Sequence, residues 1–430
     1  MIRVAAWPRR LEGTIRLPGS KYIANRAFLM AALAQGTSRI ENAPDNRDLE
    51  RTRAFASFLG AGLQPEGDFW QVQGVGGRPV WETPRVFFCG ESGTLARWTL
   101  ALSALSLEPI RLEGASRLQE RPMAELVSVL VALGAQVEPA TARGLPLSVS
   151  GPVRGGRVTL SGQVSSQFGS ALLTLAPLLP EGLTIDFASS PVSRSYLDLT
   201  LETMRRFGVE GGRDSEWHFE VPGGQDYRAT RIRIAPDPVL AGYFMALPAV
   251  LGGSIHLPGL VPDGSGEGRL IELLGRMGLP VRVHTDGLTV LAPDGPLRAL
   301  GTVDLSDAPD GVPTLAVLAA LVGEGTSRLT GIGHLRFKES DRLLDLAGEM
   351  VAAGLSVQVE GEDLVIAGGG RLRPVVMDAH GDHRLAMSFA LLAMACPGLA
   401  IRGEESVGKS FPDFWRALGQ LGISWTPSSE

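Results

Sequence analysis

The segment Ala27-Phe-Leu-Met-Ala-Ala-Leu-Ala-Gln-Gly36 places eight apolar residues in a row and then reaches a glycine. A helix that is apolar nearly all round belongs inside a core rather than on a surface. A glycine just after it suits the left-handed turn with which helices commonly stop. The segment therefore predicts a buried helix that ends near Gly36 and is followed by a strand.

The same pattern of apolar helix, stop and strand recurs six times along the 430 residues, which indicates an internal repeat. The stops lie 72, 74, 71, 72 and 73 residues apart, at Gly36, Glu108, Gly182, Gly253, Gly325 and Gly398. A second helix also ends at a glycine, with spacings of 74, 74, 70, 76 and 68 residues, at Gly60, Gly134, Gly208, Gly278, Gly354 and Gly422. The chain therefore reads as six copies of a strand-helix-strand-helix-strand repeat.

The two helices of each repeat differ in their hydrophobic pattern. The first is apolar nearly all round and is expected at Ala27–Ala34, Leu95–Leu105, Ala171–Leu179, Ala241–Leu251, Leu315–Val322 and Leu385–Ala395. The second is amphipathic, as at Met123–Leu133 and Leu343–Ala353, which predicts a position on an outer face. Three repeats around three buried helices make one globule, so six repeats predict an α/β protein of two globular domains.

Bulk composition limits the class of protein. With 44% hydrophobic and 20% charged residues, it is ordinary for a globular chain. No apolar run approaches ~18 residues, so no transmembrane helix is expected. The net charge of −6 argues against a dedicated nucleic-acid binder. Cys89 and Cys396 cannot build a disulfide framework, and the histidines show no metal-ligand spacing, so we expect a metal-free protein in a reduced cytoplasm.

Each first helix follows a polar turn, and these turns lie at 18–21, 89–93, 163–167, 235–238, 308–311 and 380–384. Helix N-termini bind anions, because they carry free N–H groups and the positive end of the helix dipole. Ser and Asp there are also common N-caps, and capping is the favoured interpretation of Asp237. Lys338 and Arg342 stand at another helix start, where cations are unfavourable, which indicates an external anion.

Eight short motifs stand in register with the repeats, at Leu17-Pro-Gly-Ser-Lys-x3-Asn-Arg26, Glu91-Ser-Gly-Thr94, Glu120-Arg-Pro122, Ser165-Ser-Gln167, Pro309-Asp310, Lys338-Glu-Ser-Asp-Arg342, Gly381-Asp-His-Arg384 and Gly408-Lys409-Ser-Phe-Pro-Asp413. Together they resemble the EPSP synthase family of enolpyruvyl transferases, in order and over essentially the whole chain. Each motif is weak alone, but their joint order is highly specific.

The resemblance implies two globules of three repeats, an inside-out α/β barrel in each, that close on the substrates between them. It places residues 18–229 in one domain and residues 1–17 with 230–430 in the other, so that the chain crosses near Leu17 and Thr230. It also implies transfer of the enolpyruvyl group of phosphoenolpyruvate to the 5-hydroxyl of shikimate 3-phosphate, through a tetrahedral adduct and with no cofactor or metal. The expected enzyme is a cytoplasmic monomer without nucleic-acid or membrane partners.

The resemblance also assigns residues to the two substrates. Phosphoenolpyruvate is assigned to Lys21, Gly93, Arg121, Gln167, Arg342, Arg384 and Lys409. Shikimate 3-phosphate is assigned to Lys21, Tyr22, Arg26, Ser165, Ser166, Gln167, Ser193, Asp310, His334 and Lys338, with Arg26 facing the ring carboxylate. In catalysis, Asp310 takes the proton of the attacking hydroxyl, and Glu339 protonates the methylene carbon with help from Lys21. The excess of matched cations over matched acids suits two substrates that each carry a carboxylate and a phosphate.

Four positions depart from the family pattern, at Tyr22, Ala24, Trp98 and His334. They keep open an enolpyruvyl transferase with another acceptor, or a non-catalytic relative that binds anions. The sister transferase acting on UDP-N-acetylglucosamine has a reactive Cys in the loop matching residues 114–121, which here holds no Cys. A ring-shaped DNA clamp of six repeats would need cations along its inner helices, which are apolar in this chain.

Overall fold

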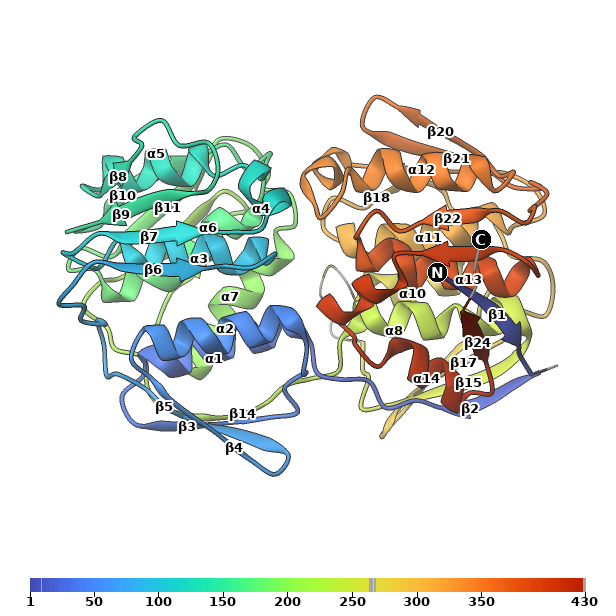
Figure 1. Ribbon diagram of the computed structural model, residues 1–430, viewed down its shortest axis with the longest axis horizontal. Coiled ribbons are helices and arrows are strands. Elements are labelled where there is room, and N and C mark those ends of the chain that lie inside the picture. The colour runs from blue at the N-terminus through green and yellow to red at the C-terminus, as the bar shows by residue number, and fades with distance from the viewer. Residues whose placement is uncertain (9, 263–265, 267, 428–430) are drawn as a thin grey trace. The chain divides into compact units, whose positions relative to one another are not determined.

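The computed structural model describes residues 1–8, 10–262, 266 and 268–427 (Figure 1). The chain divides into two compact units. The terminal unit joins Met1–Pro18 to Ala235–Glu430, and the central unit is Gly19–Ile234. Each unit has its own hydrophobic core of buried side chains.

The central unit holds three four-stranded sheets of one design. Their orders are β14-β3-β5-β4, β6-β7-β9-β8 and β10-β11-β13-β12. In each sheet the first two strands are parallel, and the last two form an antiparallel hairpin. The strands are β3 (Thr37–Glu41), β4 (Gly62–Glu66), β5 (Phe69–Gln73), β6 (Arg85–Phe88), β7 (Ile110–Glu113), β8 (Gln136–Glu138), β9 (Leu147–Ser150), β10 (Gly156–Leu160), β11 (Leu183–Phe187), β12 (Gly212–Arg213), β13 (His218–Val221) and β14 (Arg231–Arg233).

The terminal unit repeats this design, with orders β16-β17-β15-β2, β18-β19-β21-β20 and β22-β23-β1-β24. In the last sheet, β1 lies between β23 and β24, where the other sheets have the returning hairpin strand. The N-terminal strand therefore completes the sixth repeat. The strands are β1 (Ile2–Ala6), β2 (Leu11–Thr14), β15 (Gly253–Pro258), β16 (Val281–His284), β17 (Gly287–Leu291), β18 (Gly301–Asp304), β19 (Thr326–Thr330), β20 (Ser356–Glu360), β21 (Asp363–Ala367), β22 (Val376–Asp378), β23 (Ala400–Arg402) and β24 (Ser424–Pro427).

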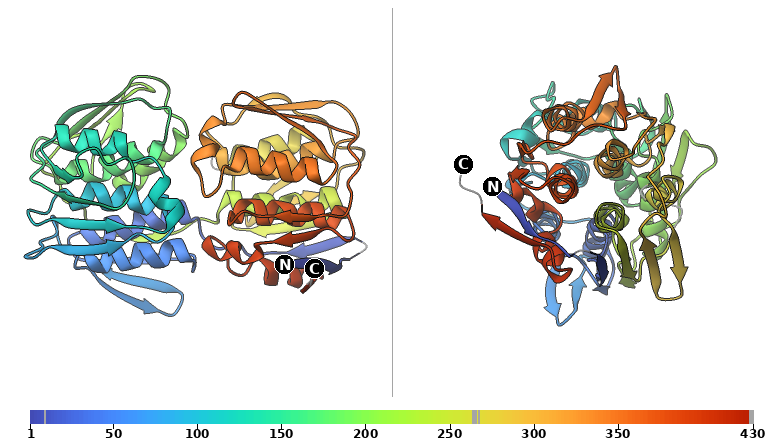
Figure 2. Two further views of the ribbon diagram at one scale, coloured as in Figure 1. Left: turned by 45° about the horizontal axis from the view of Figure 1, so that its top comes forward. Right: turned by 90° about the vertical axis from the view of Figure 1, so that its right-hand side faces the viewer.

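Apolar helices form the middle of each unit, and the sheets lie outside them, as the end-on view of Figure 2 shows for the terminal unit. The buried helices are α1 (Lys21–Leu33), α3 (Gly93–Ser103), α6 (Ser166–Leu175), α8 (Pro238–Met245), α9 (Leu247–Leu251), α11 (Val312–Ala320) and α13 (His383–Ala395). The arrangement follows from their composition, because a helix without a polar face gains most by burial on all sides.

The remaining helices present one apolar face to the core. They are α2 (Arg47–Phe58), α4 (Ser116–Glu120), α5 (Ala124–Ala132), α7 (Ser195–Arg206), α10 (Arg269–Arg276), α12 (Arg342–Ala352) and α14 (Phe414–Gln420). Short 3₁₀ turns are η1 (Ala176–Leu178), η2 (Pro309–Gly311), η3 (Gly333–Phe337) and η4 (Glu404–Lys409). Three of these turns, η2, η3 and η4, carry predicted substrate residues.

Two local predictions were wrong. A single strand was expected after each second helix, but five repeats have a hairpin there, as at β20 and β21, where the turn includes Gly361 at φ +66°. The fourth apolar helix was expected to run unbroken through Ala241–Leu251, but it divides at Ala246 into α8 and α9. Pro248 explains the break, because proline lacks the N–H that a continuous helix requires.

Candidate active site

Arg342, the first residue of α12, is the centre of a buried ion-pair cluster in the terminal unit. Its Nε and Nη2 donate to the two carboxylate oxygens of Asp382, at 2.7 and 3.2 Å. Its Nη1 donates to Asp310 Oδ1 at 2.6 Å, and its Nη2 also donates to Glu339 Oε2 at 2.8 Å. Burial alone would lower the pKa of Arg342, but the three carboxylates outweigh it and raise that pKa.

Two further cations complete this cluster. Lys409 Nζ lies 3.2 Å from Glu339 Oε1, and Arg384 Nη2 lies 3.6 Å from Asp310 Oδ2. The backbone N–H of Arg384 donates to Asp382 at 2.8 Å, so Asp382 caps α13 while it pairs with Arg342. The structure thus brings together Asp310 and Glu339, which the resemblance assigned to catalysis, with Arg342, Arg384 and Lys409, which it assigned to phosphoenolpyruvate.

His334 and Lys338 lie beside this cluster, in η3 and at its end. His334 is 6% exposed. Burial, and then the charge of Lys338, lower the pKa of His334 to about 3. The imidazole is therefore neutral near pH 7, and it offers one donor and one acceptor rather than a charge.

Arg26 is the corresponding buried cation of the central unit. Its Nε donates to Thr200 Oγ1 and its Nη1 to the carbonyl of Tyr22, both at 2.8 Å. Its Nη2 donates to the carbonyl of Tyr196 at 2.8 Å and to Ser170 Oγ at 3.3 Å. Four of the five N–H groups of Arg26 therefore already have acceptors. One N–H is left for the carboxylate of a ligand, so the guanidinium could not bind that carboxylate in a bidentate way. Burial lowers the pKa of Arg26 to about 10, which leaves it charged at neutral pH.

Lys21 begins α1, and its Nζ lies 3.1 Å from Asp48 Oδ2 in the first turn of α2. The sequence analysis missed Asp48, because an acidic residue at a helix start is ordinary dipole compensation and carries no specific signal. The ring of Tyr22 packs against the ring of Tyr196, with centroids 4.8 Å apart. The large side chain at position 22 therefore has an aromatic partner within its own unit.

Gly93 begins α3 and lies directly under Arg121. A Cβ at position 93 would fall 2.2 Å from Arg121 Nη1, so a side chain there would displace the guanidinium. Gln167 Nε2 donates to Thr94 Oγ1 at 3.0 Å, next to the same helix start. Gln167 Oε1 is buried and finds no hydrogen-bond partner among the residues that the structure describes. Three of the predicted phosphoenolpyruvate residues of the central unit, Gly93, Arg121 and Gln167, thus lie around the start of α3.

The predicted serines lie at helix starts. Ser165 caps α6 by accepting from Gln167 N at 3.2 Å, and Ser166 is the first residue of that helix. Ser193 is buried and has φ +55°, a conformation that few residues other than glycine adopt. Asp237 accepts from two N–H groups of α8, so the interpretation of Asp237 as a cap is confirmed.

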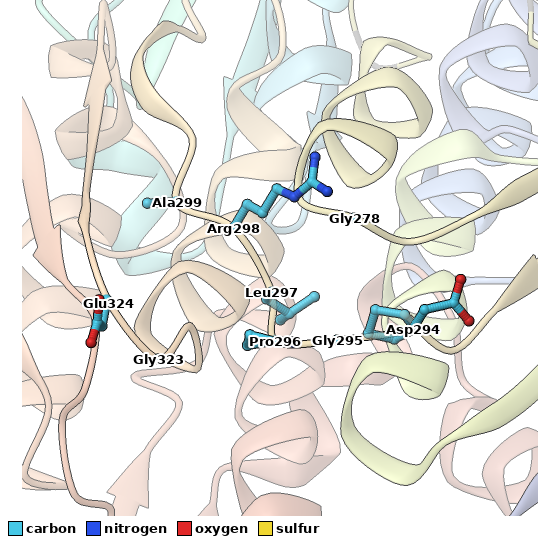
Figure 3. Close-up of a pocket in the computed structure, with 10 residues that line it drawn as sticks. Gly278, Asp294, Gly295, Pro296, Leu297, Arg298, Ala299, Gly323 and Glu324 are labelled. Carbon is cyan, nitrogen blue, oxygen red and sulfur yellow. The ribbon is translucent and has the colours of Figure 1, made fainter.

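Other features of the described chain contribute no second centre. Burial raises the pKa of Cys89 to about 12, so its thiol is not a ready nucleophile. A pocket of about 780 Å³ opens on the terminal unit, but its charged side chains Asp294, Arg298 and Glu324 point apart (Figure 3). Among the described residues, no three His, Cys, Asp or Glu side chains lie together in a way that could hold a metal ion. In the same residues, we find no helix with the length and hydropathy of a membrane span.

Comparison with known sequences gives a consistent result. A family model described as EPSP synthase (3-phosphoshikimate 1-carboxyvinyltransferase) matches residues 6–418. A 3-phosphoshikimate 1-carboxyvinyltransferase of Methanoculleus marisnigri is 39% identical over 415 residues, which cover 96% of this chain and 97% of the relative. One from Sodalis glossinidius is 34% identical over 428 residues, covering 98% and 97%.

Solved structures with a similar fold include an EPSP synthase from Acinetobacter baumannii, with a TM-score of 0.81, 23% identity and coverage of 100% of this chain and 99% of that chain. The enolpyruvyl transferase NikO from Streptomyces tendae gives a TM-score of 0.75 at 18% identity, covering 99% and 98%. At these identities the similarity supports the fold alone. It confirms the predicted α/β architecture with helices inside the sheets.

The lowered pKa of His334 predicts a specific dependence of stability on pH. The folded pKa of about 3 lies below the ordinary value of 6.5, so below pH 6.5 the unfolded chain binds a proton that the folded chain does not. Stability is therefore lost as pH falls. Between pH 7 and pH 5, the wild-type chain should lose up to about 2 kcal/mol more unfolding free energy than His334→Asn, which cannot titrate. Urea unfolding at both pH values measures the difference, and equal losses would contradict it.

Proposed function

The chain belongs to the EPSP synthase family, and from that membership we propose that it transfers the enolpyruvyl group of phosphoenolpyruvate to the 5-hydroxyl of shikimate 3-phosphate, releasing phosphate. The observation that carries the proposal is the cluster around Arg342. Both carboxylates needed for proton transfer, Asp310 and Glu339, there share hydrogen bonds with one buried guanidinium. A cluster of this kind can bind an anion and can also supply the carboxylates for acid–base catalysis.

Phosphoenolpyruvate binding must change the contacts of Arg342. Four of its five N–H groups donate to carboxylates, so an anionic group of the substrate must compete with Asp310 or Glu339 for them. Arg384 and Lys409 lie against the same two carboxylates and add positive charge. In this proposal the substrate anion neutralises part of the positive charge of Arg342. Asp310 and Glu339 then lose hydrogen bonds to Arg342 and become available for proton transfer.

The released carboxylates then have separate roles. Asp310 accepts the proton of the 5-hydroxyl while the hydroxyl oxygen forms a bond to the central carbon of phosphoenolpyruvate. Glu339 delivers a proton to the methylene carbon, which gives the tetrahedral adduct. Loss of phosphate and of a proton from the new methyl group then forms the enolpyruvyl product. Neutral His334 suits a position beside a substrate hydroxyl, since it offers hydrogen bonds without adding charge.

The acceptor residues lie largely in the central unit. Arg26 supplies a buried positive charge for the ring carboxylate, while Ser165, Ser166 and Ser193 stand at helix starts suited to a phosphate. Lys338 is a further cation that the resemblance assigns to shikimate 3-phosphate. Shikimate 3-phosphate is therefore assigned mainly to α1, α6 and the turn before α7.

We also propose that the two units are separately folding domains of a cytoplasmic monomer without a nucleic-acid partner. Separate hydrophobic cores support the domains. Two buried, unlinked cysteines agree with a reducing compartment, and the net charge of −6 disfavours nucleic acid.

Product formation from pure substrates tests the function directly. With both substrates present, ³¹P NMR should show phosphoenolpyruvate being replaced by orthophosphate together with a new phosphomonoester. Neither substrate alone should release phosphate. Absence of product, or turnover with UDP-N-acetylglucosamine in place of shikimate 3-phosphate, would contradict the proposal.

Asp310→Asn tests the general base. The amide keeps the shape and polarity of the carboxylate, so substrate binding should largely persist, while kcat should fall by roughly 10²–10⁴. Asp294→Asn is the matched control, because Asp294 is an exposed carboxylate of the same unit in the pocket of Figure 3. The control should turn over like the wild type. Full kcat in Asp310→Asn would remove Asp310 from the mechanism.

A further inference from the structure

Trp98 is the largest side chain that is almost fully buried, at 1% exposure, and it lies in the second turn of α3. Its indole Nε1 donates to two acceptors on α6, the carbonyl of Ser170 at 3.2 Å and Thr174 Oγ1 at 3.0 Å. The hydrogen bonds fix the plane of the ring relative to α6.

The fixed ring faces Arg26 on α1. The guanidinium carbon of Arg26 lies 5.1 Å from the centroid of Trp98, within the range of a cation–π contact. Tyr196 contacts the same guanidinium, with its ring centroid at 5.9 Å. Ser170 links the two residues, because its carbonyl accepts from Trp98 while its hydroxyl accepts from Arg26. Trp98 thus restrains Arg26 both directly and through Ser170.

The groups that surround the charge of Arg26 differ from those that surround the charge of Arg342. Arg342 is neutralised by three carboxylates, whereas Arg26, within the described part of the chain, has no ion pair with a carboxylate. Neutral carbonyls, hydroxyls and aromatic faces surround it instead. A buried cation without a counter-ion is costly, and an anionic ligand would lower that cost.

We propose that Trp98 is a positioning residue, which holds Arg26 in the orientation that receives the anionic acceptor and so sets the affinity for shikimate 3-phosphate. The inference rests on the proposed function. The aromatic face stabilises the charged guanidinium without neutralising it, because a ring quadrupole carries no net charge. A carboxylate in the place of Trp98 would also stabilise the charge of Arg26, but it would compete with the anionic substrate for the guanidinium. The aromatic residue therefore keeps the positive charge available.

Titration calorimetry of two variants with shikimate 3-phosphate tests this role. Trp98→Met keeps an apolar side chain but loses the ring, and it should bind shikimate 3-phosphate roughly 5–30-fold more weakly. Trp98→Phe keeps a ring above Arg26 and should bind within about threefold of the wild type. Phosphoenolpyruvate KM should change by less than about threefold in both, since Ser170, Thr174 and Arg26, which Trp98 contacts, are not among the residues assigned to phosphoenolpyruvate.

Trp81→Leu is the control for a merely structural role. Trp81 is also buried in the central unit, and its Nε1 donates to the carbonyl of Phe58 rather than to α6. This variant should melt at a lower temperature while its affinity for shikimate 3-phosphate stays that of the wild type.

The outcomes separate the two proposals. If the wild type does not bind shikimate 3-phosphate, the proposed function fails. If the wild type binds and Trp98→Met binds equally well, the role of Trp98 is wrong. A tenfold loss in Trp98→Phe also overturns it, whether or not Trp98→Met folds, because the aromatic face would then be insufficient.

Discussion

The side chain of Arg342 is positively charged and only 1% exposed, and the geometry of the candidate site in the terminal unit depends on how that charge is neutralised. Removing a charged group from water costs several kcal/mol unless well-placed partners compensate. Asp382 provides that compensation through two hydrogen bonds, and it also caps α13. The Asp382 carboxylate thus fixes both the start of α13 and the side chain of Arg342 at the start of α12. Asp310 and Glu339 are then held by the remaining donors of Arg342.

The central unit uses its buried cation in the opposite way. Arg26 is held by neutral oxygen atoms and aromatic rings, so its charge is restrained but not cancelled. The two arginines therefore suit different tasks. In the proposed function, Arg342 exchanges carboxylate partners for a substrate anion, which couples binding to the release of acid and base groups. In the same proposal, Arg26 presents a fixed positive potential, which selects an anionic acceptor without the loss of a carboxylate partner.

The repeat pattern explains why much of this was predictable from sequence. The spacing of six apolar helices indicated six similar repeats. The cations at helix starts indicated sites for anions. The insertion of β1 between β23 and β24 left no local signal, since strand partners are chosen by pairing across the whole chain. Contacts such as Arg342 with Asp382 and Trp98 with Ser170 join residues 40 and 72 positions apart. Motifs identified Arg342 and Arg26, and also Asp310 and Glu339. They did not reveal that Asp382 pairs with Arg342 or that Trp98 packs against Arg26.

If the Arg342–Asp382 pair organises the site, a double-mutant cycle must show that the two side chains depend on each other. Urea unfolding of Asp382→Asn, Arg342→Gln and the double variant gives the coupling free energy between the two side chains. We expect a coupling of about 2–3 kcal/mol, because either single change leaves a buried charged or polar group without its partner. Additive losses, with a coupling below about 0.5 kcal/mol, would contradict it.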